Sequence, residues 1–187
     1  MLFQIISLLL EVVTGVVGGA CLLRLYMQHQ RIPMTARSGN PLGRFVFVLT
    51  DWLVLPLRRL VPAVGRWDTA SLLGVFLIEL AQFSLLWAFT SFGASYRSVL
   101  ILATFGVVRL AISGLTGLVI VYAILSWLQG HSLMADIIDR LVAPALAPIR
   151  RFIPLVGGVD LSPLVLLVLL QVAAIVLGSL QASALML

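Results

Sequence analysis

Long apolar stretches separated by short polar connections dominate the chain. Four of them are long enough to cross a bilayer, because a hydrocarbon core of roughly 30 Å takes about 20 helical residues. They cover about residues 2–27, 69–90, 98–127 and 161–180. The third is longer than one crossing requires, so we expect it to tilt or to protrude. The pattern predicts an all-α membrane protein with four transmembrane helices.

Two shorter segments place apolar residues at helical spacing between the spans. The first begins at Asn40, a favourable N-cap, followed by Pro41 at the first helical position, and should stop or kink before Pro56. Its predicted apolar face is Leu42, Phe45, Val46, Leu49, Trp52 and Leu53. The second begins at Ser132, with a face of Leu133, Met134, Ile137, Ile138 and Leu141. At about 14 residues each, both fit helices lying at the membrane interface. A soluble cytoplasmic hairpin is the alternative.

One motif occurs twice, as "PLRRLVPAVGRWD" from Pro56 and as "PIRRFIPLVGGVD" from Pro148. The shared residues are two prolines, an arginine pair, a glycine and an aspartate: Pro56, Arg58, Arg59, Pro62, Gly65 and Asp68 in the first copy, and Pro148, Arg150, Arg151, Pro154, Gly157 and Asp160 in the second. We expect the prolines to end a helix, the glycine to permit a turn and the aspartate to cap the next span. The motif predicts two parallel repeats in a single membrane domain, residues 1–92 and 93–187, each with a cytoplasmic interfacial amphipathic helix.

Composition and charge support this picture. Hydrophobic residues make up 61% of the chain and charged residues 10%, whereas soluble domains have about 45–50% and about 25%. The first and third connections hold nine arginines and the second holds one, which predicts that the first and third face the cytoplasm and both termini face outward. The net charge of +5 therefore indicates contact with anionic lipid headgroups rather than nucleic acid. Cys21 is the only cysteine, and we expect neither a disulfide nor a metal site.

Three charged residues lie far from any span end, namely Glu11, Glu79 and Arg109. Such residues usually face the bundle interior and pair with one another. Aligning the first and third spans matches Glu11 to Arg109, and it also matches two pairs of small residues, Gly15 to Ser113 and Gly19 to Gly117. Small residues four apart allow helices to approach closely. We expect the two spans to pack there, with a buried Glu11–Arg109 pair and Glu79 near it. This cluster is either structural, within the bundle or a homo-oligomer, or part of a proton- or ion-linked site.

Two segments, "LTDWLVLPLRRLVPAVGRWDTASLL" and "LVAPALAPIRRFIPLVGGVDLSPLVLLVLLQ", resemble the paired signature of the YggT family, also called YlmG in other bacteria and in plastids. The first copy departs from the pattern at Trp52 and at Thr69-Ala70-Ser71, and the second at Val142-Ala143. The resemblance implies an inner-membrane protein associated with osmotic-stress tolerance and ion uptake, with cell division, and in plastids with cytochrome-complex assembly. These phenotypes do not specify a mechanism.

Two classes of function remain open. An enzyme is the least favoured class, because the chain lacks recognisable catalytic motifs and its two histidines, His29 and His131, are expected in loops. We also expect no cofactor. A membrane scaffold or assembly factor would use the two arginine pairs and interfacial helices to bind lipid or a protein partner on the cytoplasmic face. An ion channel or transporter component would use Glu11, Glu79 and Arg109, and four spans per chain would require a homo-oligomer to form a pore.

Overall fold

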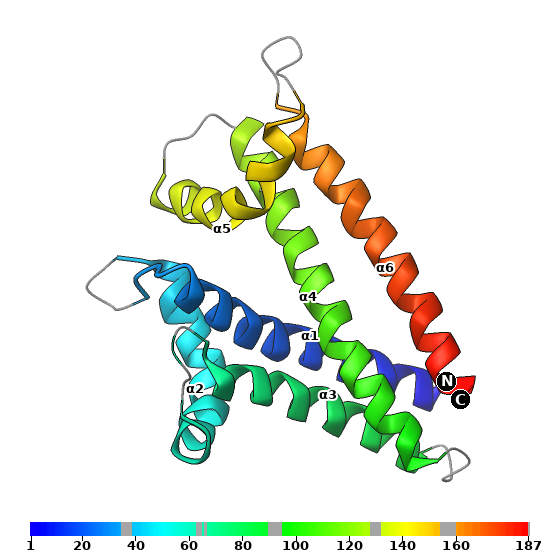
Figure 1. Cartoon of the computed structure of the whole chain (residues 1–187). Coiled ribbons are helices and arrows are strands. Elements are labelled where there is room, and N and C mark those ends of the chain that lie inside the picture. The colour runs from blue at the N-terminus through cyan, green and yellow to red at the C-terminus, as the bar shows by residue number, and fades with distance from the viewer. Residues whose placement is uncertain are drawn as a thin grey trace. The chain divides into compact units, whose positions relative to one another are not determined.

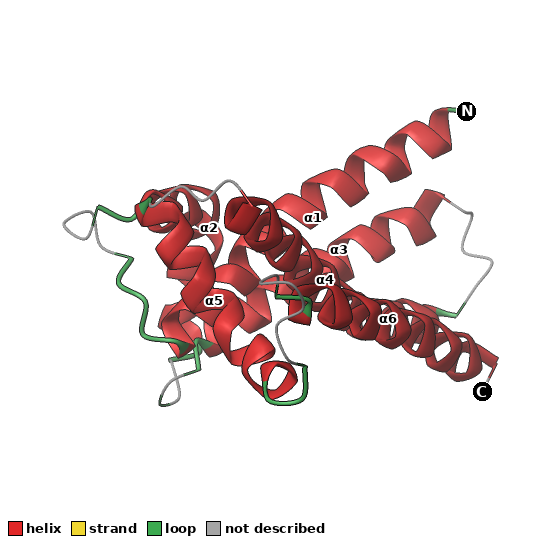
Figure 2. Ribbon diagram, turned by 90° about the horizontal axis from the view of Figure 1, so that it is seen from above, coloured by secondary structure: helices red, strands yellow, loops and turns green. Residues whose placement is uncertain are grey.

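The computed structural model describes residues 1–34, 39–62, 65, 67–89, 95–127, 132–153 and 160–186. The elements of these residues are six helices: α1 (Leu2–His29), α2 (Pro41–Leu60), α3 (Thr69–Phe89), α4 (Tyr96–Trp127), α5 (Leu133–Arg150) and α6 (Ser162–Met186) (Figures 1 and 2). Helices α1, α3, α4 and α6 are long and apolar enough to cross a membrane. The four predicted spans are therefore confirmed as helices, and the third is a helix of 32 residues.

The chain divides into two compact units, residues 1–111 with 177–187, and residues 112–176. In the first unit α1, α2 and α3 pack against one another (Figure 1). Their shared core contains Cys21 of α1, Val54 and Leu57 of α2, and Ala70 and Val75 of α3. Val107 and Leu110, in the first half of α4, pack against this cluster. The core thus holds the amino-terminal end of α3 against the carboxyl-terminal half of α1.

Local chemistry at the start of α2 follows the prediction. The Asn40 side chain accepts a hydrogen bond from the Gly43 amide at 3.2 Å, and Pro41 opens the helix. The Asn40 amide also donates to the Pro33 carbonyl at 3.0 Å. A Cβ at Gly43 would lie 2.6 Å from the Met34 carbonyl oxygen, so only glycine lets the preceding chain lie this close to the helix.

The end of α2 differs from the prediction. The helix does not stop before Pro56 but continues through it to Leu60, and α5 likewise includes Pro148. The alternative of a kink at Pro56 stays a prediction. A proline inside a helix removes one backbone hydrogen bond and costs about 3 kcal/mol. In α2 this cost is offset by tertiary packing, because Val54 and Leu57 on either side of Pro56 are both buried in the core. The proline that follows the end of the helix is Pro62.

The buried face of α2 also differs from the predicted one. The buried residues are Gly43, Val46, Thr50, Val54 and Leu57, and of the six residues predicted to form the apolar face only Val46 is among them. Phe45 and Trp52 are exposed instead. In α5 the buried residues are Ile137, Ile138, Leu141, Val142 and Leu146, three of which were predicted. Helical periodicity identifies apolar faces, but α2 has more than one, and the packing on α1 and α3 selects between them.

Two histidines were expected in loops. His29 is instead the last residue of α1, and its ring lies 4.7 Å from that of Trp67, centroid to centroid. His131 lies outside the described residues. At the other end of α3, Trp87 makes an edge-to-face contact with Tyr96 at 5.7 Å, which joins the end of α3 to the start of α4.

Candidate functional site

The repeated arginine–aspartate motif forms an ion pair in the first half of the chain. Arg58, near the end of α2, donates from Nη2 to Asp68 Oδ2 at 2.6 Å and from Nε to Oδ1 at 3.3 Å. Asp68 is fully buried just before α3, and it also accepts from the Ser71 hydroxyl at 2.7 Å. Arg58 Nη2 further donates to Gln28 of α1 at 3.1 Å. This contact set, which we call the first clasp, joins the ends of α1, α2 and α3.

A buried arginine completes the first clasp. Arg24 of α1 is only 2% exposed, and its Nη1 donates to Thr50 Oγ1 and to Asp51 Oδ1 of α2, both at 2.7 Å. Its Nε lies 3.8 Å from Asp68 Oδ2, and its guanidinium sits over the Phe47 ring at 4.9 Å. A guanidinium so far from water requires such counter-charges. The sequence did not predict this role for Arg24.

The charge state of Asp68 follows from these contacts. Burial alone would raise the pKa of its carboxyl, but the hydrogen bonds from Arg58 and Ser71 and the positive charges of Arg58 and Arg24 outweigh it. The pKa therefore lies below its ordinary value of 3.8. Asp68 is ionised at neutral pH and balances the two arginines. We predicted that Asp68 caps the next helix; its side chain meets Arg58 and Ser71.

The second copy of the motif forms a more exposed ion pair. Arg150 Nε donates to Asp160 Oδ2 at 2.9 Å, and Arg150 Nη2 donates to the Tyr122 hydroxyl of α4 at 2.6 Å. Asp160 Oδ1 accepts from the Ser162 amide at 2.9 Å, at the start of α6. Burial alone would raise the pKa of Asp160, but the hydrogen bonds from Ser162 and Arg150 outweigh this effect. The pKa of Asp160 therefore lies below its ordinary value. We call this set the second clasp; its Arg150 and Asp160 side chains are 37% and 26% exposed.

The two clasps differ at the position of Arg24 and at the two positions that pair with it, and the difference has a physical reason. Tyr122 contacts Arg150 in the second clasp, and in the sequence alignment it is the counterpart of Arg24. Where α2 supplies Thr50 and Asp51 to Arg24, α5 has Val142 and Ala143. At these three positions the second half therefore has neither the cation nor the polar residues that would pair with it. These substitutions were visible in the sequence and were the signal for the Arg24 site.

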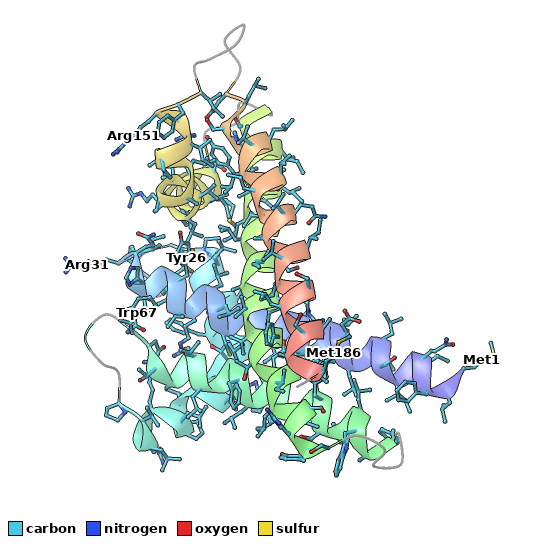
Figure 3. All side chains as sticks on the ribbon, turned by 45° about the vertical axis from the view of Figure 1, so that its right-hand side comes forward. Met1, Tyr26, Arg31, Trp67, Arg151 and Met186 are labelled. Carbon is cyan, nitrogen blue, oxygen red and sulfur yellow. The ribbon has the colours of Figure 1, made fainter. Side chains whose placement is uncertain are left out.

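The second arginine of each pair has a different environment from the first. Arg59 and Arg151 are exposed, whereas Arg58 and Arg150 are held by aspartates. Figure 3 shows Arg151 projecting away from the end of α5. Gly65 adopts a positive φ of 61°, as a tight turn requires. Pro154 and Gly157 lie outside the described residues.

The charges within the spans are arranged differently from the prediction. Glu79 of α3 is 3% exposed, and its Oε2 is buried without a hydrogen-bond partner. It lies close enough to Arg109 and Glu11 for electrostatic interaction with both. However, Glu11 and Arg109 are themselves exposed, and among the ion pairs of the described residues none joins them. The buried member is Glu79, and the predicted buried Glu11–Arg109 pair is wrong.

The predicted contacts of Gly15 with Ser113 and of Gly19 with Gly117 would join the two compact units and stay a prediction. A Cβ at Gly15, Gly19 or Gly117 would meet nothing within 4 Å, and Ser113 is exposed. Within the first unit, close approach of α1 and α4 occurs at Gly18, where a Cβ would lie 2.7 Å from Leu110 Cδ2. Close approach also occurs at Gly106 of α4, where a Cβ would collide with the Glu79 carboxylate.

The described residues contain no group of three His, Cys, Asp or Glu side chains that could hold a metal ion. Four long apolar helices and charged clasps at helix ends define a multi-pass α-helical membrane protein.

Comparison with known proteins identifies the family to which the chain belongs. The model of the CCB3/YggT family matches residues 1–89 and 101–181, so the chain belongs to this family. It is 33% identical over 171 residues to the uncharacterized protein YggT of Escherichia coli K12, covering 89% of this chain and 86% of the relative. It is 36% identical over 160 residues, 84% of each chain, to an uncharacterized Vibrio alginolyticus protein in the proC 3′ region. A Haemophilus influenzae protein is 31% identical over 150 residues, covering 80% and 78%. No solved structure matches.

Proposed function

We propose that this YggT-family protein is a scaffold or assembly factor of the bacterial inner membrane. Its two repeats have the same orientation in the membrane, with both arginine-rich connections in the cytoplasm and both termini in the periplasm. The distribution of arginines among the connections supports this orientation. The family match in two stretches of similar length supports the repeats, and the bacterial relatives support the location. The link to osmotic-stress tolerance or cell division rests on the family resemblance.

The different environments of the two arginines in each pair carry this proposal. Arg58 and Arg150 are used inside the fold, while the next residue of each pair is exposed and is followed by an exposed apolar residue. Leu60 is 78% exposed after Arg59, and Phe152 is 85% exposed after Arg151. Arginines and aromatic residues are the side chains that most often dominate protein interfaces. Each turn therefore offers a cation beside an apolar group to a partner with an acidic and apolar surface.

Photo-crosslinking in cells tests the proposal. A photoreactive amino acid replaces Phe152, and a matched control replaces Val168, which is exposed on α6 within a span. We expect a discrete protein adduct from position 152 and only lipid adducts from position 168. The substitution Arg151→Gln should abolish the protein adduct without lowering the amount of protein in the membrane. Lipid adducts alone at both positions would contradict a scaffold role.

An ion- or proton-linked transport role is a second candidate, and one observation favours it. Glu79 is a buried carboxylate near the middle of α3, with one oxygen lacking a hydrogen-bond partner. Ionisable residues at such depth often mark ion or proton pathways. Purified protein in liposomes should then conduct protons or potassium ions, and Glu79→Gln should abolish the flux. Flux no greater than that of empty liposomes would eliminate this candidate and leave the scaffold proposal intact.

A further inference from the structure

Helix α2 has an exposed apolar stripe on the side opposite its buried face. The stripe consists of Phe45, Val48, Trp52 and Leu55, which follow the three- and four-residue spacing of one helix face. These side chains are between 50% and 73% exposed. The core-facing residues of α2 contact α1 and α3, which lie on its other side (Figure 1). Four large apolar side chains on one exposed face indicate a surface that is covered when the protein functions.

The charges around the stripe are positive. Arg44, Asp51 and Arg58 recur every seven residues along one flank of the helix, but Asp51 and Arg58 are engaged by Arg24 and Asp68. The Asp51 side chain is 41% exposed, but its charge is balanced by Arg24. The net charge exposed along the stripe therefore comes from Arg44 near its start and Arg59 at its end. An apolar face bordered by arginines matches the boundary between acyl chains and anionic headgroups.

The corresponding face of α5 has a different character. At the positions 92 residues later, Arg44, Val48, Trp52 and Leu55 are replaced by Asp136, Arg140, Pro144 and Ala147. All four replacements are exposed. Three of the four large apolar side chains of the stripe are lost, and the fourth, Ile137 in place of Phe45, is buried. A negative charge also stands where α2 has Arg44. An acidic residue would be repelled by an anionic membrane surface.

We propose that only one of the two helices is embedded in the membrane interface: the α2 stripe inserts between lipid headgroups and acyl chains, whereas the corresponding face of α5 faces water. The expected occupant of the stripe is an anionic bilayer surface, because the net charge along the stripe comes from two exposed arginines, Asp51 being balanced by Arg24. The position of α2 also favours this occupant. It packs on α1 and α3, two helices long and apolar enough to span the membrane, at the ends where Arg24 and Asp68 meet. This inference is independent of the scaffold proposal.

Tryptophan quenching in proteoliposomes tests this asymmetry. One full-length variant keeps Trp52 and carries Trp67→Phe, Trp87→Phe and Trp127→Phe. The matched control adds Trp52→Phe and Pro144→Trp, which moves the probe to the same position in α5. Both are reconstituted in phosphatidylethanolamine and phosphatidylglycerol. Trp52 should lose most of its emission when the lipids are brominated near the headgroup and little with aqueous iodide. The α5 probe should show the opposite pattern.

Each alternative outcome overturns the proposal. Equal iodide quenching of both probes would place the stripe in water. Equal quenching by brominated lipid would remove the asymmetry. Protection of Trp52 from both quenchers would show that protein, either a second copy or another chain, covers the stripe. If the tryptophan variants fail to fold, a nitroxide at Val48→Cys in a Cys21→Ala background replaces them. It should be more accessible to oxygen than to a water-soluble nickel complex, and the reverse would contradict insertion.

Discussion

Neutralising Asp68 is the perturbation whose effect follows most directly from the structure. The Asp68→Asn substitution keeps the shape of the side chain and removes the negative charge that faces Arg58 and Arg24. Arg24 is 2% exposed and would keep only Asp51 as a counter-charge, whereas Arg58 is 36% exposed and would stay partly solvated. Removing one partner of a buried ion pair costs about 3–5 kcal/mol. Asparagine can still accept a hydrogen bond from Ser71, and we therefore expect a loss of about 3 kcal/mol.

The second clasp supplies a matched control for this experiment. Asp160→Asn breaks the corresponding pair, but Asp160 is 26% exposed and Arg150 is 37% exposed. Pairs accessible to solvent contribute about 0.2–1 kcal/mol. The free energy of unfolding can be measured in mixed micelles by raising the fraction of sodium dodecyl sulfate. A loss for Asp160→Asn equal to or greater than that for Asp68→Asn would refute the conclusion that burial sets the strength of the two clasps.

Comparing the unmodified protein with Asp68→Asn also tests how stability depends on pH, and the sign of this dependence is definite. The pKa of Asp68 is lower in the folded protein than its ordinary value of 3.8. Its contribution to stability is therefore fully present above about pH 4 and is lost as the pH falls through the folded-state pKa. Unfolding measured on acidification below about pH 4 should become easier more steeply for the unmodified protein than for Asp68→Asn. Parallel curves would contradict this assignment.

Three further predictions concern the helix contacts. Gly106→Ala should destabilise the protein by about 1–3 kcal/mol, because the added Cβ meets the Glu79 carboxylate, whereas Gly117→Ala should be neutral or slightly stabilising; thermal unfolding compares them. Arg24→Tyr should lower the unfolding temperature. Adding Thr50→Val and Asp51→Ala, which introduce the residues found at the corresponding positions of α5, should recover part of the loss. Cys21 is 0% exposed, so a maleimide should label it only after unfolding, and rapid labelling of the folded protein would contradict the packing of α1.

Local sequence chemistry determined the helix starts, but tertiary packing determined where α2 ends. Asn40 followed by Pro41 is sufficient to predict an N-terminus, because the capping groups lie within a few residues of one another. The unfavourable effect of Pro56 is equally local, yet the helix continues because Val54 and Leu57 are buried against other helices. The sequence around a proline gives its cost and not the packing that offsets it.

The sequence likewise predicted only some of the contacts of the candidate site. The recurrence of Arg58 with Asp68 and of Arg150 with Asp160 identified residues that pair in space. The predicted Glu11–Arg109 pair relied on equal depth in two spans, and depth does not fix the rotation of a helix about its axis. The exposure of the apolar stripe of α2 could not be predicted either, since lipid-facing and core-facing residues have the same composition in a membrane protein.

The most direct test of the account compares the two arginines of each pair in one experiment. Arg58→Gln, Arg59→Gln, Arg150→Gln and Arg151→Gln are each assayed for unfolding temperature and for protein crosslinking from the adjacent turn. The account predicts that Arg58→Gln lowers the unfolding temperature most and Arg150→Gln less, while Arg59→Gln and Arg151→Gln leave it unchanged and lose the crosslinked partner. Loss of stability at Arg59 or Arg151 with crosslinking retained would contradict it.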